Sequence, residues 1–166
     1  MEKESTPFFA IRLGRGHRGF SLIELTMVVA IVAVLSAIAV PKFSNATTRY
    51  KLDAAARRLA GDIVAAQSEA IATSSSRTLT FNFTQKNYTI SSLAEDGSTV
   101  EHLTVELDQS PYDITSVAAS IASSTTTPIK FDGFGKPNGS GTVQLKIRND
   151  RKTLTIDAAT GHVKVN

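Results

Sequence analysis

The sequence lacks cysteine, and this absence limits its chemistry. Without thiols the chain can form neither a disulfide framework nor a thiolate metal site, and cysteine usage does not indicate a compartment. Its three histidines, His17, His102 and His162, are far apart, and neither an HExxH metal motif nor a GxSxG nucleophile motif occurs. We therefore predict a protein that is not an enzyme and that needs no metal or cofactor.

Charge is absent from one long stretch. No charged side chain occurs in residues 25–40, and the apolar segment 20–40 has 21 residues. That is about the length that an α-helix needs to cross the ~30 Å hydrocarbon layer of a membrane. Glu24 is the only charge in the segment. A carboxylate in such a place is costly, so it indicates a function and a charged partner.

The residues around Glu24 resemble a known processing site. The stretch Arg18-Gly19-Phe20-Ser21-Leu22-Ile23-Glu24-Leu25 is similar to the cleavage site of type IV pilins and type II secretion pseudopilins. The resemblance implies that a prepilin peptidase and N-methyltransferase cuts between Gly19 and Phe20 and methylates the new amine of Phe20. It also implies that Glu24 pairs with the amine of a neighbouring subunit. Opposite charges offset part of each other's desolvation cost, so this pair can set the register of assembly.

The resemblance divides the chain into four parts. Residues 1–19 become a cytoplasmic leader that is cleaved, 20–40 a transmembrane or filament-core helix, 41–74 its amphipathic continuation, and 75–166 a β-rich periplasmic domain. The leader has four basic residues against two acidic ones, a net charge of +2. By the positive-inside rule this end stays cytoplasmic. We expect a single pass through the bacterial inner membrane, with the body of the protein on the periplasmic side.

A secretory signal peptide is the competing interpretation of the N-terminus. Residues 37–39 (Ala-Ile-Ala) satisfy the small-residue cleavage pattern, which predicts a mature chain that starts at Val40 and a soluble periplasmic protein. Against this, Glu24 interrupts the start of the apolar run, and the 19 residues before Phe20 are long for a basic leading region.

A helix is expected to continue beyond Pro41. A proline inside a helix removes one hydrogen bond and kinks the helix without necessarily ending it, and many pilins carry a proline at the matching place. Apolar residues then recur at spacings of four and three: Leu52, Ala56, Leu59, Ile63, Ala66 and Ala70. A helix over residues 20–74 would be about 80 Å long.

After three serines at 74–76 the apolar period changes from 3.6 to 2, which predicts strands. We expect a hairpin over residues 79–90 and further strands over 100–107, 129–131, 143–147, 154–156 and 163–165. The Ser/Thr-rich stretch 120–127 predicts a solvated loop, and Asn138-Gly139 predicts a hairpin connection with positive φ. The fold class is α+β.

Three later stretches narrow the resemblance. Residues 59–70, 129–137 and 154–161 are similar to the GspH/FimT family, which comprises the H-type minor pseudopilins of type II secretion and related minor pilins of the type IV pilus. The resemblance implies a type IV pilin-like fold, with a long N-terminal helix packed on two antiparallel sheets. It also implies a minor subunit that joins other pilins or pseudopilins in a periplasmic filament.

An alternative function is DNA binding during DNA uptake. Some FimT-type minor pilins use a C-terminal Gly-Arg-x-Arg motif for this, and the matching residues here are Gly161, His162, Val163 and Lys164. A lysine lacks the bidentate fork with which arginine binds phosphate. Further basic residues occur nearby in the sequence, so a small basic face with salt-sensitive phosphate binding is possible; its members are Lys146, Arg148, Arg151, Lys152, His162 and Lys164.

Overall fold

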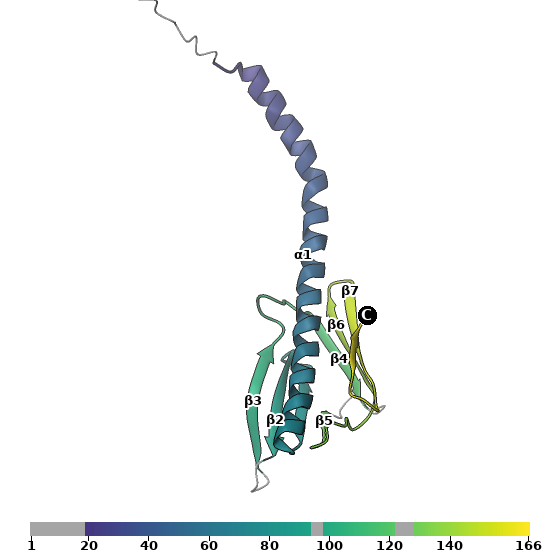
Figure 1. The fold of residues 1–166 in the computed structure, drawn as a ribbon. Helices are drawn as coiled ribbons and strands as arrows, with labels where there is room; N and C mark the ends of the chain where they lie inside the picture. Colours follow the sequence, from purple (N-terminus) through teal and green to yellow (C-terminus); the bar gives the residue numbers. More distant parts are fainter. Residues whose placement is uncertain (1–18, 94–97, 122–127) are drawn as a thin grey trace, which may run out of the picture. The chain divides into compact units, whose positions relative to one another are not determined.

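The computed structural model describes residues 19–93, 98–121 and 128–166, and the chain divides into two units. The first unit is Met1–Pro41 and the second is Lys42–Asn166. One helix, α1 (Leu22–Thr73), begins in the first unit and ends in the second, and its backbone stays helical at Pro41 (Figure 1). Each unit is described below by itself.

In the first unit, the helix begins just after three residues without regular structure. The amide of Leu25 donates to the carbonyl oxygen of Ser21 at 3.1 Å and closes the first turn. The side chains of residues 22–39 are all exposed, and those of the large apolar residues are 49–81% exposed. By length and composition this segment is suited to crossing a membrane.

In the second unit, α1 buries the predicted stripe. The six residues at spacings of four and three are all at most 2% exposed, together with Ala55, which lies beside Ala56. Charged residues stay off this stripe, and Arg57 pairs with Asp53 four residues earlier at 2.9 Å. Burial along this part of α1 therefore follows the 3.6-residue period, as in an amphipathic helix.

Two antiparallel four-stranded sheets accompany the helix in the second unit. Their orders are β3-β2-β1-β5 and β4-β6-β7-β8. The strands are β1 (Arg77–Asn82), β2 (Asn87–Leu93), β3 (Thr99–Glu106), β4 (Ser116–Ile121), β5 (Ile129–Phe131), β6 (Gly141–Ile147), β7 (Asp150–Ile156) and β8 (Val163–Val165). The predicted α+β class with two antiparallel sheets is confirmed.

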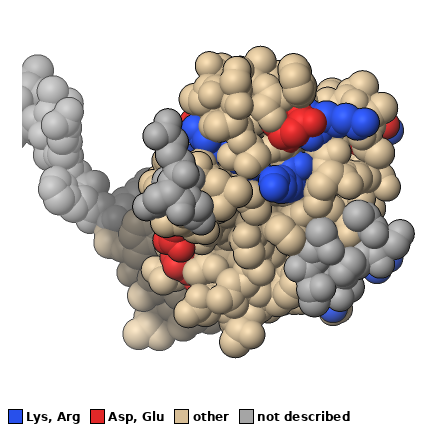
Figure 2. Space-filling view, turned by 90° about the horizontal axis from the view of Figure 1, so that it is seen from below, with Lys and Arg blue, Asp and Glu red and all other residues tan. Residues whose placement is uncertain are grey.

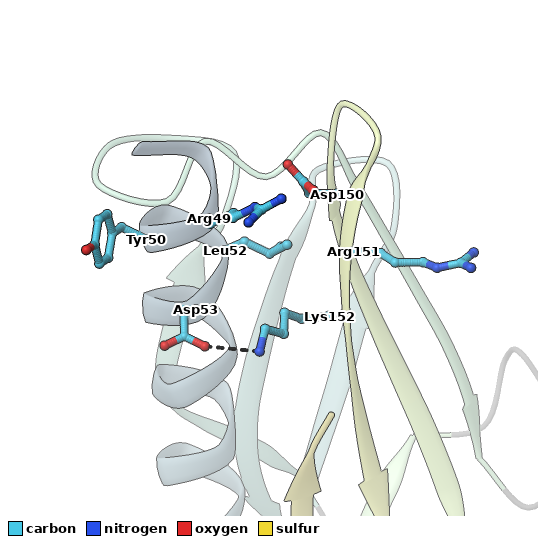
Figure 3. A pocket seen from close by; sticks show the side chains of 7 residues that line it. All are labelled: Arg49, Tyr50, Leu52, Asp53, Asp150, Arg151 and Lys152. Carbon is cyan, nitrogen blue, oxygen red and sulfur yellow. Dashed lines mark ion pairs between the residues drawn. The ribbon is translucent and has the colours of Figure 1, made fainter. Parts of the chain in front are cut away.

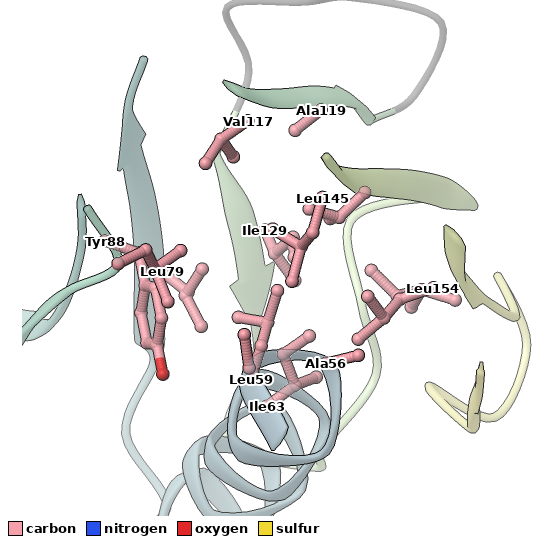
Figure 4. Close-up of a cluster of buried hydrophobic side chains, with 14 of the residues drawn as sticks. Ala56, Leu59, Ile63, Leu79, Tyr88, Val117, Ala119, Ile129, Leu145 and Leu154 are labelled. Carbon is pink, nitrogen blue, oxygen red and sulfur yellow. The ribbon is translucent and has the colours of Figure 1, made fainter. Parts of the chain in front are cut away.

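The core lies where α1 meets both sheets (Figure 4). Leu59 and Ile63 come from the helix, Leu79 from β1, and Leu145 and Leu154 from the second sheet; each is fully buried. Figure 4 shows these side chains converging from three sides on one cluster. The helix fills the space between the two sheets. Its buried alanines are small, so the strands can pack close to the helix beside the larger leucine side chains.

Two local predictions are wrong. Residues 120–121 belong to β4, not to a loop, whereas 122–127 lie outside the described residues. Positive φ occurs at Gly135 and not at Asn138 or Gly139. The side chain of Asn138 instead accepts a hydrogen bond from the amide of Lys130 at 3.1 Å and donates to the carbonyl oxygen of Pro128 at 2.9 Å. These two bonds hold the connection without a two-residue turn.

Candidate functional site

The predicted cleavage site lies at the start of the described chain. Gly19, Phe20 and Ser21 are exposed and precede the helix, so the bond between Gly19 and Phe20 is not part of a regular element. A Cβ added to Gly19 would meet no heavy atom within 4 Å, and the side chain of Phe20 is 83% exposed. An accessible bond outside regular structure is what a peptidase needs.

Glu24 lies in the first turn of α1, where a carboxylate interacts favourably with the helix dipole. Within residues 19–93, 98–121 and 128–166, no side chain forms an ion pair with it, and it is surrounded along the helix by exposed apolar side chains. Exposed apolar surface of this extent is typical of membrane or protein contacts. Glu24 is therefore available to a partner from outside the described chain. Pro41 lies within the helical backbone of α1.

The basic residues that the sequence singled out lie on the hairpin β6–β7 and on β8, and the structure separates them. Lys146 and Arg151 are directly opposite each other in the register of β6 and β7. Arg148 occupies the turn between these strands with φ +53°, and its Nη1 donates to the Oγ of Ser44 at 3.4 Å. These three cations therefore gather at one end of the hairpin.

Lys152 has a different environment. It lies opposite the fully buried Leu145, on the side of the hairpin that faces α1, and its Nζ is 3.3 Å from Oδ1 of Asp53. That hydrogen bond is the main reason why the pKa of Asp53 lies below its ordinary value, with the charge of Arg57 adding to it. Lys152 is thus ion-paired within the domain, to a carboxylate that also pairs with Arg57, and is not part of a free basic face.

The C-terminal candidates lie farther along the sheet. Lys164 pairs with Thr155, four residues along β7 from Arg151 and so about 13 Å away along the strand. His162 lies just before β8, where its carbonyl oxygen accepts from the amide of Asp157 at 3.0 Å. The structure therefore brings Lys146, Arg148 and Arg151 together but keeps His162 and Lys164 apart from them. The strand register, which the sequence alone did not reveal, places Lys146 directly beside Arg151 in this group.

A shallow cavity of about 360 Å³ lies between α1 and the hairpin (Figure 3). Its lining residues are Arg49, Tyr50, Leu52, Asp53, Asp150, Arg151 and Lys152. In Figure 3 the side chain of Arg49 points toward Asp150, whereas Arg151 points away from the helix into solvent. Asp150 therefore lies on the helix-facing side of the hairpin, and Arg151 lies on the opposite side. On the described part of the face in Figure 2, by contrast, a few basic groups are scattered among uncharged ones, some beside acids.

Comparisons with known proteins agree with this architecture. The family model described as type II transport protein GspH matches residues 55–161, and the prokaryotic N-terminal methylation motif matches residues 14–40. The chain belongs to the GspH family. The predicted relationship is thereby confirmed, and the methylation motif covers the Gly19–Phe20 bond and Glu24.

Two relatives from Pseudomonas aeruginosa match shorter segments. The chain is 46% identical over 57 residues to type II secretion system protein H, which is 34% of this chain and 33% of that protein. It is 39% identical over 54 residues to a fimbrial protein, which is 32% of this chain and 35% of that protein. The matches thus span about a third of the length of these curated relatives.

Solved structures share the fold. The minor pseudopilin EpsH from the type 2 secretion system of Vibrio cholerae superposes with a TM-score of 0.57 at 10% identity, over 70% of this chain and 96% of that one. The type IV minor pilin FimU of Pseudomonas aeruginosa gives a TM-score of 0.55 at 17% identity, over 72% and 91% of the two chains. At these identities the likeness concerns the fold, and it is equally close for the secretion and the pilus protein.

Proposed function

We propose that this GspH-family chain is a minor pseudopilin or minor pilin, a structural subunit that joins other pilin-like subunits in a periplasmic filament. The observation that carries the proposal is the exposed apolar helix of residues 22–39, in which Glu24 is the only charge. A soluble monomer would not leave so much apolar surface in water. A subunit that first spans a membrane and later packs among the helices of a filament has this apolar surface covered in both places.

The membrane arrangement follows from the same segment. Residues 20–40 form the single span in the inner membrane, the basic leader 1–19 stays in the cytoplasm, and the domain of residues 42–166 faces the periplasm. The leader is removed between Gly19 and Phe20 by a prepilin peptidase. The accessibility of that bond and the absence of a side chain on Gly19 support this site.

Assembly then depends on the new amine of Phe20 and on the carboxylate of Glu24. A subunit that enters the filament must bury both charges among apolar helices, which is costly unless they meet each other or a neighbour's group. A neighbouring subunit is favoured when its amine lies at the same level along the filament axis as the carboxylate of Glu24. The two charges therefore select the axial register of the subunits. The β-sheet domain provides the surfaces that distinguish one partner subunit from another.

The decisive experiment is the intact mass and N-terminal sequence of the mature protein, expressed in a host with its own prepilin peptidase. The proposal expects a chain that starts at N-methylated Phe20 and stays in the membrane fraction. A Gly19→Leu variant is the matched control and is expected to keep its leader. A mature chain that starts at Val40 and is soluble would instead establish signal-peptide cleavage and overturn the filament proposal.

A further inference from the structure

Three unneutralised cations gather at the end of hairpin β6–β7; we call Lys146, Arg148 and Arg151 the hairpin cation cluster. Lys146 and Arg151 are direct cross-strand partners, so their Cβ atoms are about 4.5–5.5 Å apart, and like charges in this position destabilise a sheet. Among the described residues, none of the three has a carboxylate within ion-pair distance. The domain thus keeps an unfavourable arrangement that an anion would relieve.

Two neighbouring lysines, unlike the cluster, each have a carboxylate partner. Lys51 is paired with Asp113, and Lys152 is paired with Asp53. The remaining acid of the hairpin, Asp150, is in the cavity that faces the helix, on the side toward Arg49, while Arg151 points the other way (Figure 3). Asp150 therefore does not neutralise the cluster; Arg151 points away from α1, whereas Arg148 reaches Ser44 at the membrane-proximal end of the domain.

The position of the cluster along the chain identifies its environment. Arg148 is hydrogen-bonded to Ser44, which follows Val40 by four residues. Four residues reach at most about 14 Å even when fully extended, and about 6 Å when helical. The polar headgroup layer adds roughly 5–8 Å on each side of the hydrocarbon core. If residues 20–40 span the membrane, chain connectivity alone keeps Ser44 and Arg148 beside the headgroups.

We propose that the hairpin cation cluster binds the phosphate groups of anionic phospholipids at the periplasmic surface of the inner membrane. This inference rests on the proposed function, because it requires the span at 20–40. Arginine presents a planar fork that matches phosphate oxygens, and Lys146 adds a third positive charge to the same patch. The contact holds the β-sheet domain at the membrane before assembly, and it is released when the subunit leaves the bilayer for the filament.

Lipid fits these observations better than DNA. A nucleic-acid strand would use a continuous basic track, but Lys164 is about 13 Å from Arg151 along the strand direction, and Lys152 is occupied by Asp53. A membrane surface needs only a compact patch at the right height. The three cations supply such a patch.

The absence of cysteine allows a direct test. Asn149, exposed in the β6–β7 turn, is changed to cysteine and carries one fluorophore in the full-length chain. The chain is placed in nanodiscs of phosphatidylcholine alone or with phosphatidylglycerol, together with a lipid whose headgroup carries a quencher. We expect stronger quenching with phosphatidylglycerol, which weakens as salt is raised because the attraction is screened. The ratio of docked to free turns is expected to fall about fivefold for each cation removed.

The test variant combines Lys146→Gln, Arg148→Gln and Arg151→Gln. The matched control removes the same charge from three exposed lysines elsewhere, Lys130→Gln, Lys136→Gln and Lys164→Gln. The proposal expects loss of the phosphatidylglycerol effect in the test variant and its retention in the control. Salt titration of the unsubstituted, labelled chain gives the same reading without any risk to folding.

Other outcomes overturn the proposal. If quenching does not change with phosphatidylglycerol or salt, or if it falls equally in both triple variants, a specific lipid contact is excluded. A test variant that keeps its lipid contact but loses binding to duplex DNA would assign the cluster to DNA instead. Failure of the proposed function looks different, because the chain would then not insert into nanodiscs at all.

Discussion

The side-chain nitrogen of Gln67 donates a hydrogen bond to the carbonyl oxygen of Gly135, 2.8 Å away. The same nitrogen is also 2.8 Å from the carbonyl oxygen of Thr160. One helical side chain therefore holds the loop between β5 and β6 and the loop between β7 and β8 against α1. Since β5 and β8 belong to different sheets, this residue helps to fix both sheets on the helix.

Replacing Gln67 should loosen this junction. Gln67→Leu leaves the part-buried carbonyl oxygen of Gly135 and the exposed one of Thr160 without their donor, and we expect it to lower the free energy of unfolding by about 1 kcal/mol. The neighbouring variant Ser68→Ala is the control, because Ser68 is exposed and, within the part of the chain that the structure describes, its hydroxyl bonds only to Val64 on its own helix. Urea unfolding in mild detergent, followed by near-UV circular dichroism, measures both. Equal midpoints for the two variants would contradict the proposed role.

Two glycines predict opposite effects of the same substitution. Gly161 has φ +72°, and an added Cβ would lie 2.6 Å from Nε2 of Gln67 and 3.0 Å from Cε1 of Phe131. Gly61 is in the exposed part of α1, where an added Cβ would meet nothing within 4 Å. We expect Gly161→Ala to lower the free energy of unfolding by more than about 1 kcal/mol, and Gly61→Ala to raise it by about 0.5–1 kcal/mol.

The comparison of these two variants needs no further control, because the chemical change is identical. Thermal unfolding in the same detergent reports both. A destabilising Gly61→Ala would contradict the prediction that the added methyl group has open space.

Much of this fold follows from local patterns. Burial along α1 follows the spacing of Leu52, Leu59 and Ile63, and β6 and β7 follow the alternation that ends in Ile147 and Ile156. These features could be predicted because each depends on residues close together in sequence. The processing motif at Gly19 and Phe20 is local as well.

Other features depend on contacts between distant segments. Strand β4 was not predicted, because its inward positions include the small Ala119 and its apolar alternation is therefore weak. Its pairing with β6 also depends on residues far away in the sequence. The bonds of Gln67 reach residues 68 and 93 positions away. Likewise, the sequence placed Lys146 only near Arg151, and the register of β6 and β7 makes them neighbours.

Tyr88 predicts how stability responds to alkaline pH. It is fully buried, and its hydroxyl donates to the carboxylate of Asp62, which also accepts from Nε of Arg58 at 2.9 Å. Burial, and then the bond to Asp62, raises the pKa of Tyr88 far above its ordinary value. In the unfolded chain a tyrosine loses its proton near pH 10.

Above about pH 10 the folded state therefore holds a proton that the unfolded state has released, so stability falls as pH rises. Tyr88→Phe removes this dependence and one hydrogen bond. We expect a loss of about 1 kcal/mol near pH 7 and a smaller difference from the unsubstituted chain as pH rises beyond 10. Tyr50→Phe, at an exposed tyrosine, controls for the general effect of alkali. A constant difference between Tyr88→Phe and the unsubstituted chain from pH 7 to 11 would refute the pKa argument.

A substitution at Glu24 tests assembly separately from cleavage of the leader. Glu24→Gln keeps the size of the side chain but removes its charge, so the peptide bond between Gly19 and Phe20 stays accessible while the Phe20 amine loses the partner that we propose for it. Leaving one buried charge unpaired is strongly destabilising, so we expect normal cleavage but at least about tenfold less subunit in sheared filaments. Thr26→Val is the matched control, because among the described residues the Thr26 hydroxyl bonds only to the carbonyl oxygen of Ile23 in its own turn. Mass spectrometry of the N-terminus and quantification of the filament fraction measure the two steps separately. Wild-type incorporation of Glu24→Gln would show that the carboxylate is not needed for assembly, whereas an uncleaved product would move its role to recognition by the peptidase.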